Sequence, residues 1–495
     1  MDYVTLRHRI DYNLTQLRLA EQRASQMAPL LPFANRIRQL QESRLDRQRA
    51  DPRTVATQLN DMARDVRALT AALEAEAARG PVRRRGVTPA IAARASAQIV
   101  HLRATLSEWN TFYDGYDPTF SWWVRRPYGA ADEALAAYAA AIDRRLVGLT
   151  PDAPAPIVGD PVLAAGLEAD LAVEMMPYNA RELIAIGERE FAWIERELRL
   201  VSNRMGFGDD WRAALEHTKN LAPPPGEAPW AIYDIAAYSE QFILDRNLIS
   251  MSPLAREVWR LAMQTPERQL INPFFTGGEV TRLSYPSDSM DHDDKLMSLR
   301  GNTPHFNFPT VQHELIPGHY HQRFMNDRYN LHRSPLSPTP FWREGWALYW
   351  EFRLWDMDFA RNDPDRVGML FWRLHRAARI VFSLNYQLGN WTPQQAVTFL
   401  VDRVGHERAN AEAEVRRSAR DAPLYQIAYM IGALQFEALH REAVLSGRMD
   451  ERAFHDAIMQ GGPMPVELVR ARVLGLELAP DYQAHWRFYE DAPRR

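Results

Sequence analysis

The stretch Asn179–Gly206, NARELIAIGEREFAWIERELRLVSNRMG, decides the fold class of this chain. Its Ala, Leu, Ile and Trp residues recur at intervals of three and four, which is the period of a helix that buries one face. Asn179 is typical of a helix start, and Gly206 or Gly208 of a helix end. The same period predicts further helices over residues 2–28 (with Leu6, Ile10, Leu14 and Leu17 on one stripe), 53–79, from Thr88 and Pro89 onward, 131–147, and from Pro309 to the C-terminus.

We therefore predict an all-α architecture with at most a small β-element. The strand candidate is EVTRLSYPS, residues 279–287, where Val280, Leu283 and Tyr285 interrupt the helical period. The polar segment that follows, residues 288–309, is expected to be a loop outside the core. Pro-rich connectors at 150–161 and 221–229 suggest boundaries. They divide the chain into an N-terminal helical region, 1–150, and a helical catalytic region, 151–495, or leave one integrated domain.

Composition excludes several classes of protein. The 495 residues carry a formal net charge of -4, so no basic field gathers nucleic acid, and no stretch is apolar for long enough to span a bilayer. There is no cysteine, so a metal site must use His, Asp or Glu. The charged N-terminus is not a signal peptide. Location is open between the cytoplasm and, if a signal was removed, export; the oligomeric state is open too.

Chemistry concentrates in Thr310–Gln322, TVQHELIPGHYHQ. In the usual zinc-peptidase pattern, two His residues four apart share a helix face, and the Glu beside the first activates water. Here His313 and His319 are six apart, which is about 240° of rotation on an unbroken helix. Pro317 and Gly318 can break that helix, so we predict a bulge or kink that returns His319 to the face of His313. His321 is the alternative second ligand.

The third ligand is expected from Pro340–Glu351, PFWREGWALYWE. Glu344 lies among Trp, Ala, Leu and Tyr, where an unpaired carboxylate is costly to bury and a cation would offset that cost. Glu351, two turns later, is either a partner of a ligand His or an ordinary surface acid, and we favour the surface acid.

The nearby histidines His292, His305 and His332 are expected to be solvated loop residues. His313 and His319 alone could be no more than a polar patch on a helix, and Glu344 is what strengthens the metal hypothesis.

These strings resemble a large bacterial family, domain of unknown function 885. HELIPGHYHQ, REGWALYWE, YQIAYMIGALQFEALHREA and FHDAIMQGGPMPVELVRARVLG occur in the order typical of that family, and residues 6–33 resemble its N-terminal region. The resemblance implies a zincin-like helical peptidase with a central cleft, similar to carboxypeptidase Taq, thimet-type oligopeptidases and angiotensin-converting enzyme. Residue by residue, it implies His313, His319 and Glu344 as zinc ligands, Glu314 as general base and Tyr429 as oxyanion donor.

Two residues of the matching helices have competing explanations. Tyr429 could instead be a buried tyrosine that packs on Leu434. Arg379 could bind a substrate carboxylate, but a structural ion pair explains it equally well. Residues 385–391, NYQLGNW, depart from the family's pattern because they lack its His, which suggests a different specificity or weaker activity.

The predicted function is a zinc-dependent peptidase that hydrolyses short peptides, of the oligopeptidase, dipeptidase or carboxypeptidase type. The alternatives are a zinc amidase or esterase acting on a small non-peptide, an inactive member that binds peptides or a partner protein, and, more distantly, an iron redox enzyme.

Overall fold

The computed structural model describes residues 1–150, 155–224, 226–271, 275–278, 280–337, 339–420 and 422–490. Within these residues the chain forms two compact units, residues 17–160 and residues 1–16 together with 161–495. The division falls at the first Pro-rich connector, although residues 1–16 group with the C-terminal unit. Parts of four predicted segments lie outside the described residues: 151–154 and Pro225 in the two connectors, Glu279 in the strand candidate, and Pro338, Asp421 and 491–495 in the C-terminal helical region.

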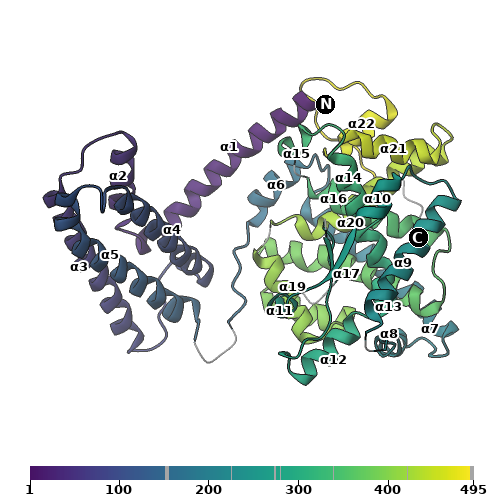
Figure 1. The fold of residues 1–495 in the computed structure, drawn as a ribbon, viewed down its shortest axis with the longest axis horizontal. Coiled ribbons are helices and arrows are strands. Elements are labelled where there is room, and N and C mark those ends of the chain that lie inside the picture. Colours follow the sequence, from purple (N-terminus) through teal and green to yellow (C-terminus); the bar gives the residue numbers. More distant parts are fainter. Residues whose placement is uncertain are drawn as a thin grey trace. The chain divides into compact units, whose positions relative to one another are not determined.

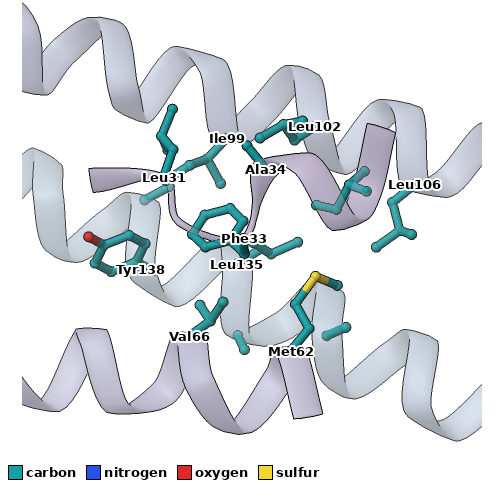
Figure 2. Packing of buried hydrophobic residues seen from close by; sticks show 14 of the residues in the cluster. Leu31, Phe33, Ala34, Met62, Val66, Ile99, Leu102, Leu106, Leu135 and Tyr138 are labelled. Carbon is teal, nitrogen blue, oxygen red and sulfur yellow. The ribbon is translucent and has the colours of Figure 1, made fainter. Parts of the chain in front are cut away.

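The unit of residues 17–160 is built from helices around an apolar core. Phe33 belongs to one cluster with Met62 and Val66 of one helix and Leu135 of another (Figure 2), and all four side chains are buried. Alanine, leucine and valine at helical spacing let these helices pack closely. The helices are α1 (Asp2–Met27, whose first residues belong to the other unit), α2 (Ala34–Leu45), α3 (Pro52–Ala77), α4 (Pro89–Tyr113) and α5 (Pro118–Ile142), with short 3-10 and π segments at Ala28–Leu30 and Asp143–Val147.

The C-terminal unit is also helical, and its elements are traced in Figure 1. They are α6 (Leu163–Val173), α7 (Ala180–Arg204), α8 (Trp211–Lys219), α9 (Ala228–Asp245), α10 (Pro253–Val258), α11 (Pro266–Ile271), α12 (His292–Gly301), α13 (Pro304–Glu314), α14 (His319–Asn326), α15 (Arg333–Leu336), α16 (Pro340–Asp356), α17 (Asp363–Gln387), α18 (Pro393–Phe399), α19 (Arg408–Arg420), α20 (Tyr425–His440), α21 (Glu451–Gly461) and α22 (Val466–Leu474), with π segments at Leu400–Val404 and Arg441–Leu445. The prediction of a mainly helical fold is confirmed.

Local sequence signals explain where several of these helices begin. The Asn179 side chain accepts hydrogen bonds from Arg181 N and Glu182 N, and the Glu182 carboxylate accepts one from Asn179 N, which completes a capping box at the start of α7. Thr88 Oγ1 accepts from Ile91 N at 3.2 Å, with Pro89 in the first turn of α4. Both starts agree with the sequence prediction.

Glycines permit a close contact between two helices of the C-terminal unit. Helices α16 and α20 pack along each other, and Gly345 of α16 touches the backbone of Gly432 in α20. A Cβ atom at either glycine would overlap the backbone of the other helix. This crossing brings the residues on either side of it, Glu344 and Tyr429, to the same cavity.

The β-structure is limited, within the described residues, to two short parallel strands and an isolated bridge. Strand β2 (Val280–Leu283) lies in the predicted segment and pairs with β1 (Arg260–Met263), which the sequence pattern did not reveal. The prediction of a loop over residues 288–309 is wrong. Helices α12 and α13 occupy most of it, and Phe306 and Phe308 are buried, because a short apolar face here packs against α9, α16 and α17.

Candidate metal centre and cavity

The two histidines of the metal motif lie on separate short helices. Helix α13 ends at Glu314, the chain turns through Leu315–Gly318, and α14 begins at His319. Gly318 N donates to Gln312 O at 3.0 Å, and a Cβ atom at Gly318 would overlap the His313 carbonyl group. Glycine is therefore required where the chain folds back on the end of α13. The predicted break is present as a tight turn between two helices, and it brings His319 to His313.

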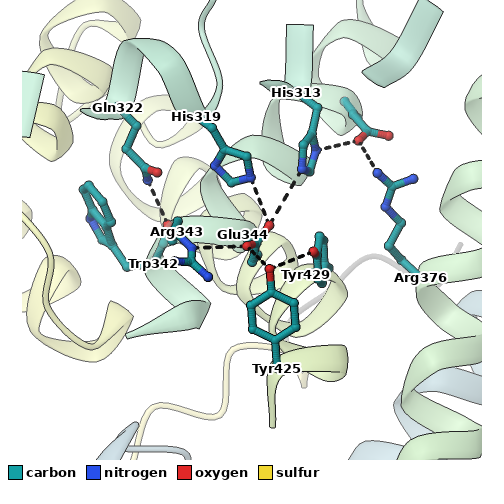
Figure 3. A network of polar contacts seen from close by, with 10 residues as sticks. His313, His319, Gln322, Trp342, Arg343, Glu344, Arg376, Tyr425 and Tyr429 are labelled. Carbon is teal, nitrogen blue, oxygen red and sulfur yellow. Dashed lines mark hydrogen bonds and ion pairs between the residues drawn. The ribbon is translucent and has the colours of Figure 1, made fainter. Parts of the chain in front are cut away.

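Three side chains converge at this turn (Figure 3). The His313 and His319 rings lie 4.8 Å apart between centroids. Glu344 Oε2 lies 3.0 Å from His319 Nε2 and 3.8 Å from His313 Nε2. The ligand atoms of His313, Glu314 and His319 all lie within 4.8 Å of one another. The structure thus brings together all four residues that the motif assigned to the metal and its water.

Glu351 is not the surface acid that we favoured from the sequence. Its side chain is 4% exposed, and its Oε1 lies 2.8 Å from His313 Nδ1. The same oxygen accepts a hydrogen bond from Arg376 Nη2 at 3.1 Å. A carboxylate bound to the outer nitrogen of a ligand His fixes the ring and its tautomer, which leaves Nε2 directed at the centre.

Two tyrosines of α20 border the centre, and the sequence analysis identified only one of them. Tyr425 Oη donates to Glu344 Oε1 at 2.8 Å, and Tyr429 Oη donates to Tyr425 Oη at 3.2 Å. The Tyr429 ring lies nearly parallel to the His313 ring at 6.1 Å. Tyr425 could have been recognised because it lies four residues before Tyr429, on the same helix face.

The electrostatics of the cluster favour a positive charge between the carboxylates. Burial opposes ionisation of Glu344, but His319 and His313 outweigh it and hold the pKa of Glu344 well below its usual range. Burial also opposes protonation of His313, but hydrogen bonds to Glu344 and Glu351 outweigh it and raise the pKa of His313 to about 9. Two imidazoles and a carboxylate are a common donor set for catalytic zinc, so these residues fit that ion.

A cavity of about 700 Å³ opens onto the centre. Its described lining includes His313, Glu314, His319, Glu344, Tyr425 and Tyr429, together with Phe275–Gly278. Gly277 lies against the Glu314 carboxylate so closely that a Cβ atom there would overlap it. A volume of this order suits a small organic ligand or a short peptide.

The remaining candidates are placed as follows. His321 is fully buried, is not among the residues that line the cavity, and is absent from the metal cluster, so the alternative second ligand does not reach the centre. Arg379 does line the cavity, and its Nε also donates to Glu414 Oε1 at 2.6 Å. His305 is not a solvated loop residue, because it lies on α13 with Nδ1 2.7 Å from Asp365 Oδ1.

Comparison with known proteins identifies the region that carries this site. Residues 279–473 match the family model described as "Bacterial protein of unknown function (DUF885)", which confirms the resemblance drawn from the motifs. No curated protein matches the chain.

Two solved structures share the fold. A candidate lipoprotein of unknown function from Shewanella oneidensis superposes with a TM-score of 0.62 at 18% identity, over 86% of this chain and 78% of its own. A candidate lipoprotein from Colwellia psychrerythraea superposes with a TM-score of 0.56 at 17% identity, over 85% of this chain and 75% of its own. At such identities the likeness concerns the fold alone. No helix among the residues described for this chain is long and apolar enough to cross a membrane.

Proposed function

We propose that this chain, which matches the DUF885 model over residues 279–473, is a zinc-dependent peptidase that hydrolyses short peptides. The observation that carries the proposal is the convergence of His313, His319 and Glu344 around one point, with the Glu314 carboxylate beside them. The donor set suits zinc, and the neighbouring glutamate suits a general base.

Each residue has a distinct role in the proposed reaction. His313, His319 and Glu344 would hold the zinc ion. Bound zinc supplies Lewis acidity, which polarises a carbonyl group and lowers the pKa of a water molecule toward 7. Glu314 accepts a proton from the attacking water and delivers it to the leaving amine.

The tyrosines and Glu351 support this chemistry. Tyr429 and Tyr425 present hydroxyl groups on the cavity wall, where a donor can stabilise the negative charge of the tetrahedral intermediate. Glu351 keeps the His313 ring in position. The cavity size favours short, unstructured peptides over folded proteins.

The test combines metal analysis with one substitution. The purified chain should bind about one zinc ion, lose hydrolysis of a peptide library on chelation, and regain it with added zinc. Glu314→Gln should keep the metal and lower turnover by roughly 10²- to 10⁴-fold. Glu188→Gln, at an exposed glutamate of α7, is the matched control and should change neither. A Glu314→Gln variant as active as the parent would overturn the proposed mechanism.

A further inference from the structure

One wall of the cavity carries three arginines. Arg376 and Arg379 lie three residues apart on α17 and so share one helix face, and Arg417 extends from α19. Arg376 and Arg379 are 4% and 6% exposed. All three line the same cavity as His313 and Glu314. Arginine keeps its charge even when buried, so this wall holds three fixed positive charges.

Within the described residues, these arginines form hydrogen bonds with two carboxylates, those of Glu414 and Glu351. Glu414 Oε1 accepts from Arg379 Nε at 2.6 Å, and Glu414 Oε2 accepts from Arg417 Nη2 at 2.8 Å. Burial opposes ionisation of Glu414, but the two guanidinium groups outweigh it and lower its pKa to about 2. Arg376 shares Glu351 with His313. Glu414 is thus shared by two of the guanidinium groups, and Glu351 is shared between Arg376 and a proposed zinc ligand.

Several guanidinium N–H donors on this wall have no acceptor among the residues that the structure describes. Within the described residues, Nε and Nη1 of Arg376 and Nε of Arg417 are buried without a hydrogen-bond partner. Buried donors are rarely left unpaired, because each loses its hydration without compensation. A carboxylate offers two acceptor oxygens in the geometry that a guanidinium group matches.

The wall lies close to the reacting centre. Cζ of Arg379 is 4.7 Å, and Cζ of Arg376 is 6.0 Å, from the centroid of the Tyr429 ring. The same ring also lies 6.1 Å, between centroids, from the ring of His313. One aromatic ring therefore separates the guanidinium groups from a zinc ligand. An extended residue spans roughly 3.3–3.6 Å, so only a few residues fit between an anchored carboxylate and the bond at Glu314.

We propose that Arg376, Arg379 and Arg417 form a subsite for the free C-terminal carboxylate of the substrate, so that the enzyme releases short C-terminal fragments. This inference rests on the proposed peptidase function and selects the carboxypeptidase type. The reaction is ordinary amide hydrolysis. Water forms a C–O bond at the scissile carbonyl, the C–N bond breaks, and the proton taken up by Glu314 passes to the departing amine.

The first experiment compares two versions of one substrate set. An N-acetylated tetrapeptide library is prepared with free C-terminal carboxylates and again as C-terminal amides, and products are identified by mass spectrometry. We expect kcat/KM for the acids to exceed that for the amides by roughly 10- to 100-fold, the value of a charged hydrogen-bonded pair. Equal cleavage of both libraries would overturn the carboxylate subsite and leave the peptidase function standing.

The second experiment measures binding without turnover. The zinc-loaded Glu314→Gln variant is titrated calorimetrically with acetyl-trialanine as acid and as amide. The acid should bind roughly 10-fold or more tightly, and Arg376→Gln or Arg417→Gln in that background should remove the difference. Arg366→Gln, on the same helix but not among the residues lining the cavity, is the control and should retain it. Equal binding of acid and amide would contradict the inference.

Two further measurements, metal content and peptide cleavage, help to interpret these variants. Metal content shows whether a substitution has damaged the site, and peptide cleavage tests the peptidase proposal separately from carboxylate recognition. Metal content is measured for every variant. Arg376 contacts Glu351, which holds a proposed zinc ligand, so its substitution could reduce zinc binding, whereas Arg417 bonds to Glu414 instead. Loss of acid preference with zinc retained supports the subsite, and preference retained in Arg417→Gln and Arg376→Gln overturns it. If no peptide is cleaved but the acid still binds through Arg376, the subsite stands and the proposed peptidase function fails.

Discussion

The core of residues 17–160 and the helices around the cavity are both closely packed, but they bury different chemistry. In the first unit the described buried side chains are apolar apart from Ser96 and Asn110. In the second, helix α17 alone buries Arg373, His375, Arg376 and Arg379. Burying a charge costs free energy unless partners compensate it. Burial in the first unit therefore stabilises the fold, whereas burial of charged groups beside the cavity of the second unit lowers its free energy of unfolding unless their partners compensate.

The largest effect is expected where the helices that carry the site touch. Gly432→Ala would force α20 away from the Phe341 and Gly345 backbone. We expect a loss of about 3 kcal/mol or more in unfolding free energy, together with loss of metal, since overpacked backbone cannot relax cheaply. Calorimetric unfolding, with a transition assigned to each unit, measures the loss of unfolding free energy.

The matched control lies in the other unit. Gly129 is inside α5, and a Cβ atom there meets open space. Gly129→Ala should leave metal binding unchanged. It should raise the free energy of unfolding by about 0.5–1 kcal/mol, because alanine favours a helix more than glycine does. Equal stability of the parent and Gly432→Ala would show that the α16–α20 contact is looser than described.

An intermediate effect is expected from the buried acid behind His313. Glu351→Gln removes the charge that holds the His313 ring, so zinc affinity should fall by roughly 10- to 100-fold. Competition with a chromogenic chelator measures it. Leu135→Ala, in the core of residues 17–160, should lower stability by about 2–5 kcal/mol without changing zinc affinity. If Glu351→Gln and Leu135→Ala weakened zinc binding by the same factor, the claim that zinc affinity depends on the C-terminal unit and not on the core of residues 17–160 would be wrong.

The smallest effect concerns pH. Burial raises the pKa of Glu174 from 4.5 to about 7, against a hydrogen bond from Thr339. The folded chain therefore binds more protons than the unfolded chain between these values, and stability contributed at this residue falls as pH rises through that window. Relative to Glu174→Gln, the parent should lose about 1 kcal/mol between pH 5 and pH 6.

Chemical denaturation of the C-terminal unit at both pH values gives this difference. Subtracting the stability of Glu174→Gln from that of the parent removes the pH dependence of all the titratable groups that the two proteins share. A stability difference between parent and variant that does not change with pH would mean that Glu174 is not buried as a neutral acid. The described core of residues 17–160 buries no charged side chain, so its unfolding should depend less on pH.

Sequence alone was sufficient for features set by nearby residues. Helical period predicted the fold class, Asn179 and Thr88 marked helix starts, and Val280–Leu283 was recognised as a strand. The four residues of the proposed centre were also identified from motifs, because the His-Glu pair before Pro317 and the acid within an aromatic helix can each be recognised from a few neighbouring positions. Such signals are local, since capping and periodicity depend on residues a few positions apart.

The tertiary structure decided which of these residues meet. The turn at Leu315–Gly318 returns His319 to His313, Glu351 is buried because α16 faces a histidine 38 positions away in sequence, and β1 exists only because β2 pairs with it. The unpaired donors of Arg376 likewise depend on what α16 and α20 place around its guanidinium group. A helical pattern specifies a face, but the partner of that face is chosen by packing between distant segments, which no local window of sequence contains.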